Sequence, residues 1–251
     1  MKKMFVKAGI AFLTIAVVWG IGPLAFVAFL AFMCAGEIRV SKHGSIPRLE
    51  PRMYILSNHP NACGVMLETV FVPAVLFIQA IMHPLKNAPL ILIDRANFTS
   101  KPIFYWLRMI TISITRGKGK TSMFREIREI KEALSRGRIV MSFGAGRDCT
   151  GTEFWHSASG KNYIRKPTDS LGILLSCIPD IKLVLVWVGA EGAVLKPKQP
   201  LFAWPWLSKK QMTVAFSEVI NSNDFLGQDP YEITKRIAAM HLALADRTTQ
   251  G

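Results

Sequence analysis

A histidine follows directly on a short apolar segment of the chain. Residues 53–57 (Met-Tyr-Ile-Leu-Ser) have the composition of a buried strand, which runs into the loop Asn58-His59-Pro60-Asn61. Loops at strand ends are where α/β folds collect ligands. His59 is therefore well placed to take part in chemistry. The alternative is a strand-end histidine that only hydrogen-bonds the backbone.

Cys63 offers a second chemistry, because a thiol near an imidazole can act as a nucleophile and form a covalent intermediate. No neighbouring residue would hold Cys63 and His59 in line, so we favour an unreactive small apolar role for Cys63. A metal site is not predicted either, since no second pair of ligands stands at a matching spacing. Cys149 and His156 share a loop, but their separation matches no familiar site. We expect no metal and no bound cofactor.

The histidine segment resembles the first motif of the 1-acylglycerol-3-phosphate acyltransferases and their glycerolipid relatives. That motif is Asn-His, four residues, and then Asp. Ser57-Asn58-His59-Pro60 matches its start, and Gly64 stands where the family has the aspartate. The resemblance covers roughly residues 50–220.

Two further motifs of this family follow in the same order. The second is a short strand that ends in a basic residue, which residues 110–116 match with Arg116 at the end. The third is Phe-Pro-Glu-Gly-Thr-Arg-Ser, and it falls on residues 143–148, where Phe143 and Gly146 are kept and Ala145 replaces the glutamate. Arg147 matches the family arginine if one residue is deleted from the loop. A fourth motif falls on residues 185–189.

The resemblance implies the transfer of an acyl group from a thioester to an alcohol. Such a reaction needs a base for the alcohol proton and a group that stabilises the developing oxyanion. The family's motif histidine is the base, and we carry that role to His59. Asn58, Arg116, Gly146 and Arg147 are implied to bind the substrate, and arginine suits a phosphate because its planar donors can contact two oxygens.

The family aspartate orients the histidine, and Gly64 has no side chain that could do so. If a helix begins near Ala62, Glu68 lies one turn beyond Gly64 on the same face and could reach back to His59. We therefore name Glu68 as the substitute. The alternative is a glutamate that faces solvent or a basic neighbour.

The resemblance also implies the partners. The acyl donor would be a thioester of acyl carrier protein or of coenzyme A, and the default acceptor would be 1-acylglycerol-3-phosphate or another lysolipid. A second hypothesis is a catalytically decayed relative that binds a lipid or a partner at the membrane. The missing carboxylates at Gly64 and Ala145 favour this hypothesis, whereas Asn58, His59 and Arg116 count against it.

Composition points to a membrane. Half of the 251 residues are apolar, the mean hydropathy is +0.27, and the formal net charge is +14. Such an excess of positive charge implies an anionic partner. Basic residues flank the N-terminal apolar segment, where each could contribute about 1 kcal/mol of attraction to an anionic leaflet. The membrane therefore accounts for the charge, and no nucleic acid is expected.

No charged residue occurs from Ala8 to Gly36, which exceeds the apolar region of a signal peptide and the roughly 20 residues of one span. The sequence Gly20-Ile21-Gly22-Pro23 in its middle can kink or break a helix. We therefore expect one kinked span or, by slight preference, two short helices that enter a single leaflet. Either arrangement would anchor the chain to a bacterial inner membrane with the catalytic domain on the cytoplasmic side.

The rest of the chain alternates between strands and helices. Strands are predicted at 53–57, 90–93, 110–115, 138–143, 182–188 and 212–216. Helices are predicted at 65–82 (interrupted near Pro73), 103–107, 121–136 and 170–177, and from Asp229 onward with a capping box to Glu232. A long polar loop is expected after residue 143.

This order predicts an α/β fold, with a mixed sheet flanked by helices as in the glycerolipid acyltransferases and an N-terminal hydrophobic helical anchor. We divide the chain into an anchor at 1–40 and one acyltransferase-like domain at 41–251.

Overall fold

The computed structural model describes residues 2–35, 38–40, 46–58, 67–94, 111–114, 119–144, 154–167, 169–189 and 212–249. Its helices are α1 (Lys2–Cys34), α2 (Leu67–Met82), α3 (Pro84–Asn87), α4 (Gly119–Ser135), α5 (Ser170–Cys177), α6 (Pro230–Thr249) and the 3₁₀ turn η5 (Ser222–Phe225). Its strands are β1 (Ile38–Val40), β2 (Met53–Asn58), β3 (Leu90–Asp94), β4 (Thr111–Ile114), β5 (Val140–Gly144), β6 (Phe154–His156), β7 (Tyr163–Arg165), β8 (Lys182–Gly189), β9 (Met212–Phe216) and β10 (Ile220–Asn221).

Among the described residues, one eight-stranded sheet carries the fold. Its strand order is β1-β9-β8-β2-β5-β3-β4, and β10 pairs with β8. The strands from β8 through β2, β5 and β3 to β4 are parallel, whereas β9 and β10 run antiparallel to β8. β6 and β7 form a separate antiparallel hairpin.

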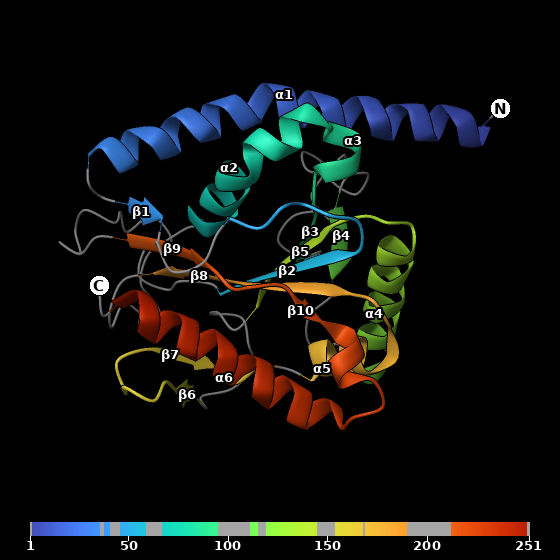
Figure 1. Cartoon of the computed structure of the whole chain (residues 1–251). Coiled ribbons are helices and arrows are strands. Elements are labelled where there is room, and N and C mark those ends of the chain that lie inside the picture. The colour runs from blue at the N-terminus through green and yellow to red at the C-terminus, as the bar shows by residue number, and fades with distance from the viewer. Residues whose placement is uncertain are drawn as a thin grey trace.

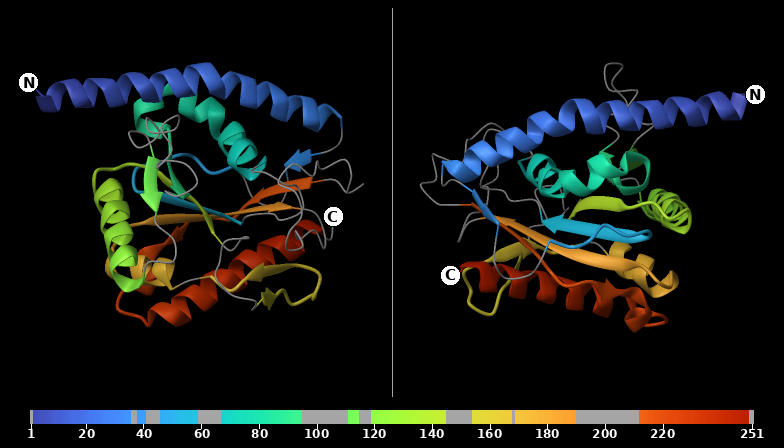
Figure 2. Two further views of the ribbon diagram at one scale, coloured as in Figure 1. Left: turned by 180° about the vertical axis from the view of Figure 1, so that it is seen from behind. Right: turned by 45° about the horizontal axis from the view of Figure 1, so that its top comes forward.

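Helices cover both faces of the sheet (Figure 1). One face packs against α2, and α1 lies along the outside of α2. The other face packs against α4, α5 and α6. Figure 2 shows the same layers from behind and from above.

The strands of this sheet are apolar on both sides because both sides are covered. In β2, Tyr54 belongs to the core beneath α4–α6, and Met53 and Ile55 belong to the core beneath α2. β8 alternates in the same way between its leucines and its valines. The predicted α/β class with helices on both faces is confirmed.

The predicted strands and helices within the described ranges are present. α5 and β9 have the predicted bounds, and the others differ by a few residues at their ends. Asp229 caps α6, since its carboxylate accepts from the N–H groups of Tyr231 (3.0 Å) and Glu232 (3.1 Å). The predicted helix at 103–107 lies outside the described residues. Sequence analysis missed α3, β1, β10 and the β6–β7 hairpin, which occupies part of the expected polar loop.

The preferred arrangement of two short N-terminal helices is wrong. α1 is one helix from Lys2 to Cys34 with Pro23 inside it. Gly22 does not break the helix but lets it approach α2, because a Cβ at this position would lie 2.4 Å from a ring carbon of Phe77. The rings of Phe26 and Phe77 pack next to this contact, with centroids 5.6 Å apart. The glycine is thus explained by helix packing.

The predicted interruption of the next helix is also wrong, because α2 runs through Pro73 to Met82. A proline inside a helix removes one backbone hydrogen bond. Burial of the neighbouring residues Val72, Ala74 and Leu76 in the core offsets that loss and keeps the helix continuous.

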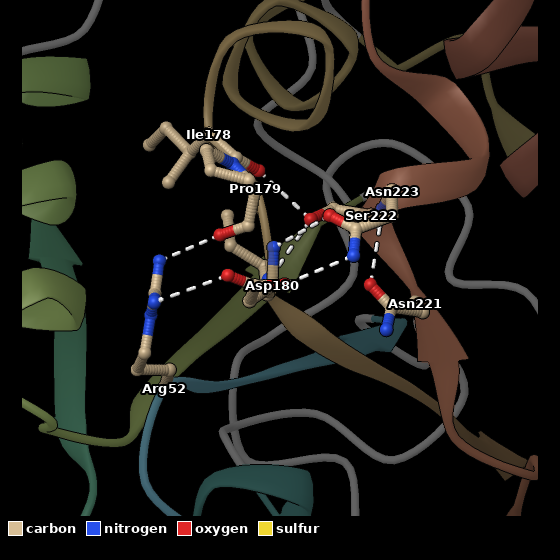
Figure 3. A network of polar contacts seen from close by, with 8 residues as sticks. Arg52, Ile178, Pro179, Asp180, Asn221, Ser222 and Asn223 are labelled. Carbon is tan, nitrogen blue, oxygen red and sulfur yellow. Dashed lines mark hydrogen bonds and ion pairs between the residues drawn. The ribbon is translucent and has the colours of Figure 1, made fainter.

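The amino-terminal edge of the parallel strands is held by a polar network (Figure 3). Arg52, just before β2, donates to the carbonyl of Pro179 (2.6 Å) and pairs with Asp180 (3.6 Å). Asp180 in turn exchanges two hydrogen bonds of 2.9 Å with Asn223. Arg52 and Asp180 have positive φ angles of 63° and 57°, a conformation that non-glycine residues rarely adopt. The network thus joins β2, β8 and η5 at the edge opposite the predicted motifs.

Candidate active site

The predicted site residues follow strands that end at one edge of the sheet. Asn58 of β2 is in register with Gly144 of β5, and Asp94 of β3 is in register with Ile114 of β4. Because these strands are parallel, their carboxyl ends meet at the same edge, which is where α/β folds bind ligands. His59 comes one residue after β2, and Arg116 comes two residues after β4.

The loop with Gly146 and Arg147 begins directly after β5. Since β2 and β5 are neighbours, this loop starts about 5 Å from the end of β2. β4 lies three strands from β2, so the segment with Arg116 starts about 14 Å away. The strand order therefore places the start of the loop that contains Arg147 closer to the end of β2 than the start of the segment that contains Arg116.

The side chains of His59, Cys63, Arg116 and Arg147, together with Gly64 and Gly146, lie outside the described residues. Glu68 is the second residue of α2 as described, and its side chain also lies outside them. Their catalytic and binding roles stay predictions. His156 lies on β6, where it is exposed.

Asn58 is the one predicted site residue whose side chain is described, and it is 4% exposed. Its amide nitrogen donates to the carbonyl of Val188 (2.8 Å), and its amide oxygen accepts from the N–H of Val188 (2.7 Å). The paired backbone of β2 and β8 runs only as far as Ser57 and Val186. The amide thus extends the junction between these strands and fixes the backbone that immediately precedes His59. Its predicted contact with substrate stays a prediction.

A buried histidine lies beside this junction. His241 of α6 is 1% exposed, and its Nε2 lies 2.8 Å from the carbonyl oxygen of Val186. Its ring meets the edge of Trp187 at a centroid distance of 5.8 Å. Burial lowers the pKa of His241 to about 4, against the opposing effect of the bond to Val186. A neutral His241 therefore supports β8 next to Asn58, a role for which the sequence gives no signal beyond an apolar helix face.

The described residues contain no group of three His, Cys, Asp or Glu side chains that could hold a metal ion. The prediction that the site uses no metal and no bound cofactor stays a prediction.

α1 presents a large exposed apolar surface. Its segment Ala8–Ala31 spans 24 residues with a hydropathy of 2.3, and 6% of the apolar stretch is buried. The exposed face is apolar, with Phe12 (74%), Trp19 (56%), Leu24 (73%) and Val27 (63%) on it. The core helix of a soluble protein would be mostly buried, which α1 is not. A signal sequence would meet the same criteria of length and hydropathy. Large exposed apolar patches usually mark an interaction surface.

The architecture is an α/β fold with a largely parallel sheet between helical layers and an apolar N-terminal helix. It resembles the crystal structure of the 1-acyl-sn-glycerophosphate (LPA) acyltransferase PlsC from Thermotoga maritima. The TM-score is 0.50 and the sequence identity 11%, and the match covers 98% of each chain. No protein-family model and no curated protein matches the sequence. The likeness to PlsC supports the motif-based resemblance at the level of the fold.

Proposed function

We propose that the chain is a membrane-bound acyltransferase that moves a fatty acyl group from a thioester to the hydroxyl of a lysophospholipid-like acceptor. The observation that carries the proposal is the likeness to PlsC over 98% of both chains. The position of His59 directly after β2, at the carboxyl edge of the sheet, supports the same conclusion. The default acceptor is 1-acylglycerol-3-phosphate, and the donor is acyl carrier protein or coenzyme A carrying the acyl group.

In the proposed reaction, His59 takes the proton of the acceptor hydroxyl as its oxygen attacks the thioester carbonyl. The carbon–sulfur bond then breaks, and the thiol leaves with a proton. The loop with Gly146 and Arg147 and the more distant Arg116 would bind the acceptor's anionic head group. Phosphate oxygens pair well with arginine donors.

The exposed face of α1 supports attachment to a membrane, which is also where a lysolipid acceptor resides. In our proposal this membrane is a bacterial inner membrane and the sheet lies on its cytoplasmic side. A lipid-facing α1 would shield the apolar side chains that are otherwise exposed to water.

The direct test uses protein reconstituted in lipid vesicles, a labelled acyl thioester and a panel of lysolipid acceptors. The parent should form product, and His59→Ala should lower kcat by at least about 100-fold, because a general base typically contributes 10²–10⁴. His156→Ala is the matched control, since it removes an exposed histidine that lies on β6 and has no predicted role. Full activity of His59→Ala would refute the assigned base.

Glu68 can be tested separately. Glu68→Gln keeps the side-chain size but removes the charge that would orient His59. We expect kcat to fall by several orders of magnitude, since loss of the carboxylate in a serine-protease triad costs about 10⁴. Near-normal turnover would eliminate Glu68 as the orienting residue.

The second candidate function is a decayed acyltransferase that binds lipid without turnover, and Gly64 in place of the family aspartate favours it. It predicts no product with any donor or acceptor, together with a measurable affinity of the folded protein for a lysolipid.

A further inference from the structure

The outward face of α4 carries positive charge around an exposed aromatic ring. Spacings of four and three residues separate Phe124, Arg128 and Lys131, so these side chains lie on one stripe of the helix. Phe124 is 57% exposed, and both basic side chains are exposed. Arg125 extends the stripe on one side.

Two acidic residues, Glu129 and Glu132, share the outward part of α4 with this stripe and offset its positive charge only in part. Glu132 pairs with Arg136 one turn further along. No ion pair to Arg125, Arg128 or Lys131 is found among the described residues. An exposed ring among unpaired cations is the composition of a binding surface, because interfaces favour aromatic and arginine side chains at their centres.

The stripe begins next to the candidate active site. β4 ends at Ile114 at the carboxyl edge, and α4 starts at Gly119, so the connection spans at most about 18 Å. α4 then leads back toward the opposite edge, where β5 starts at Val140. Phe124 lies on the second turn, near the carboxyl edge, and Lys131 lies about 10 Å further along the helix.

The membrane is a poor explanation for this charge. α1 and α2 cover one face of the sheet, whereas Ile130 and Leu134 of α4 pack into the core on the other face. Figure 1 shows α1 along one side of the molecule and α4 beside the sheet, with α6 on the far side from α1. A bilayer that covers α1 would not cover the outward face of α4.

We propose that the face of α4 formed by Phe124, Arg125, Arg128 and Lys131 docks a small acidic protein that carries the acyl group as a thioester. This inference rests on the proposed function and selects acyl carrier protein over coenzyme A as the donor. The partner's acidic surface would meet the basic residues, and an apolar residue at its centre would meet Phe124. The thioester would then reach the carboxyl edge beside α4.

The test compares two donors with one acceptor: palmitoyl-acyl carrier protein and palmitoyl-coenzyme A. Arg128→Glu/Lys131→Glu should lower kcat/KM for the protein donor by at least about tenfold, mainly through KM, because like charges would then face each other. The same variant should change kcat/KM for the coenzyme A donor by less than about twofold. Raising the salt concentration should weaken only the protein donor, since exposed charges are screened.

Lys235→Glu/Arg247→Glu on α6 is the control, because it makes the same change in net charge on another exposed helix. Equal losses with both donors, or an unchanged KM for the protein donor, would overturn the docking surface while leaving the acyltransferase in place. Reduced sedimentation of the α4 variant with anionic vesicles would also overturn it, and would assign the face to the membrane.

A second readout separates this inference from the proposed function. Fluorescence anisotropy of labelled palmitoyl-acyl carrier protein should report binding to the parent and loss of binding to the α4 variant. Binding without transfer from either donor would contradict the acyltransferase. Transfer from palmitoyl-coenzyme A without binding of the carrier protein would contradict only the docking surface.

Discussion

Asn58 uses both polar ends of its side chain to hold β8. Its amide exchanges two hydrogen bonds with the backbone of Val188, and all of these groups are buried. A buried group that loses its partner costs about 1–3 kcal/mol. The backbone immediately before His59 is thus held by a contact that spans 130 residues of sequence.

Asn58→Ala should therefore lower both stability and turnover. The N–H and C=O of Val188 would lose their partners, so we expect a loss of about 2 kcal/mol in the free energy of unfolding. kcat should fall because His59 is no longer held, while KM for the acceptor stays near its parent value. A raised KM with unchanged kcat would instead support the substrate contact predicted from the sequence.

Asn58→Asp is the informative companion variant. It keeps the acceptor for the Val188 N–H but loses the donor to the Val188 carbonyl, and it buries a charge. Thermal unfolding should show a loss at least as large as that of Asn58→Ala, since unpaired buried charge is costly.

At this scale the sequence predicted the strand that precedes His59 but not the contact that holds the end of that strand. A histidine after an apolar strand is visible in the local pattern, as are the basic residues after β4 and β5. The partner of Asn58 is a backbone group of a distant strand, and backbone groups carry no sequence signal. His241 was missed for a similar reason, because it lies on the apolar face of a helix whose pattern is dominated by Ile233 and Ile237.

Among the elements, the packing of α1 on α2 is sensitive to the addition of a single methyl group. Gly22→Ala would bring a carbon within 2.4 Å of the buried Phe77 ring, whereas Gly20 has no atom within 4 Å of such a carbon. We expect Gly22→Ala to destabilise the protein by about 1–3 kcal/mol through overpacking.

Gly20→Ala is the matched control on the same helix. Because alanine favours a helix over glycine by up to about 1 kcal/mol, Gly20→Ala should raise the unfolding temperature slightly. The measurement is thermal unfolding in detergent micelles. Equal unfolding temperatures for the two variants would show that Gly22 does not serve the close approach of α1 to α2.

These two glycines also explain why the prediction of two short N-terminal helices was wrong. Glycine and proline together signal a break when only the local chain is considered, yet here one glycine serves a contact with a residue 55 positions away. Long amphipathic elements such as α4 and α6 were predicted well, because their periodicity is itself the consequence of packing on a sheet. Short elements such as β1 and the β6–β7 hairpin have too few residues to show a period.

For the molecule as a whole, two titrating groups should weaken the fold in different ranges of pH. The pKa of His241 is about 4 in the folded protein, below its ordinary value of 6.5. The unfolded chain therefore binds this proton more readily, and stability falls as the pH drops from 6.5 to 4. The full loss is about 3 kcal/mol.

The variant His241→Gln isolates this effect, because glutamine can donate to the Val186 carbonyl but does not titrate. Denaturant unfolding at pH 7 and pH 4.5 should show a smaller drop in stability for the variant than for the parent. If both drop equally, the acid sensitivity arises at other groups.

Asp246 should affect the stability of the fold at a lower pH than His241 does. Burial alone would raise its pKa, but hydrogen bonds from Ser159 and Asn162 lower it to about 2. These hydrogen bonds join the β6–β7 hairpin to α6. Their contribution to stability is fully present above pH 3.8 and is lost as the pH falls from 3.8 to 2. Asp246→Asn should therefore weaken the hairpin at neutral pH, measured as faster amide exchange in residues 154–165.

Phe29, near the end of α1, is 3% exposed and shares the core beneath α2 with residues of β2, β8 and β9. Directly after α1, β1 adds a parallel strand to β9 at the edge of the sheet. The division of the chain at residue 40 stays a prediction, but the helix before it is not a detachable module. A gene fusion that exchanged this helix for an unrelated membrane segment would have to rebuild part of the hydrophobic core. Recombination at this boundary should therefore be rarely tolerated, and α1 and the rest of the chain are expected to evolve together.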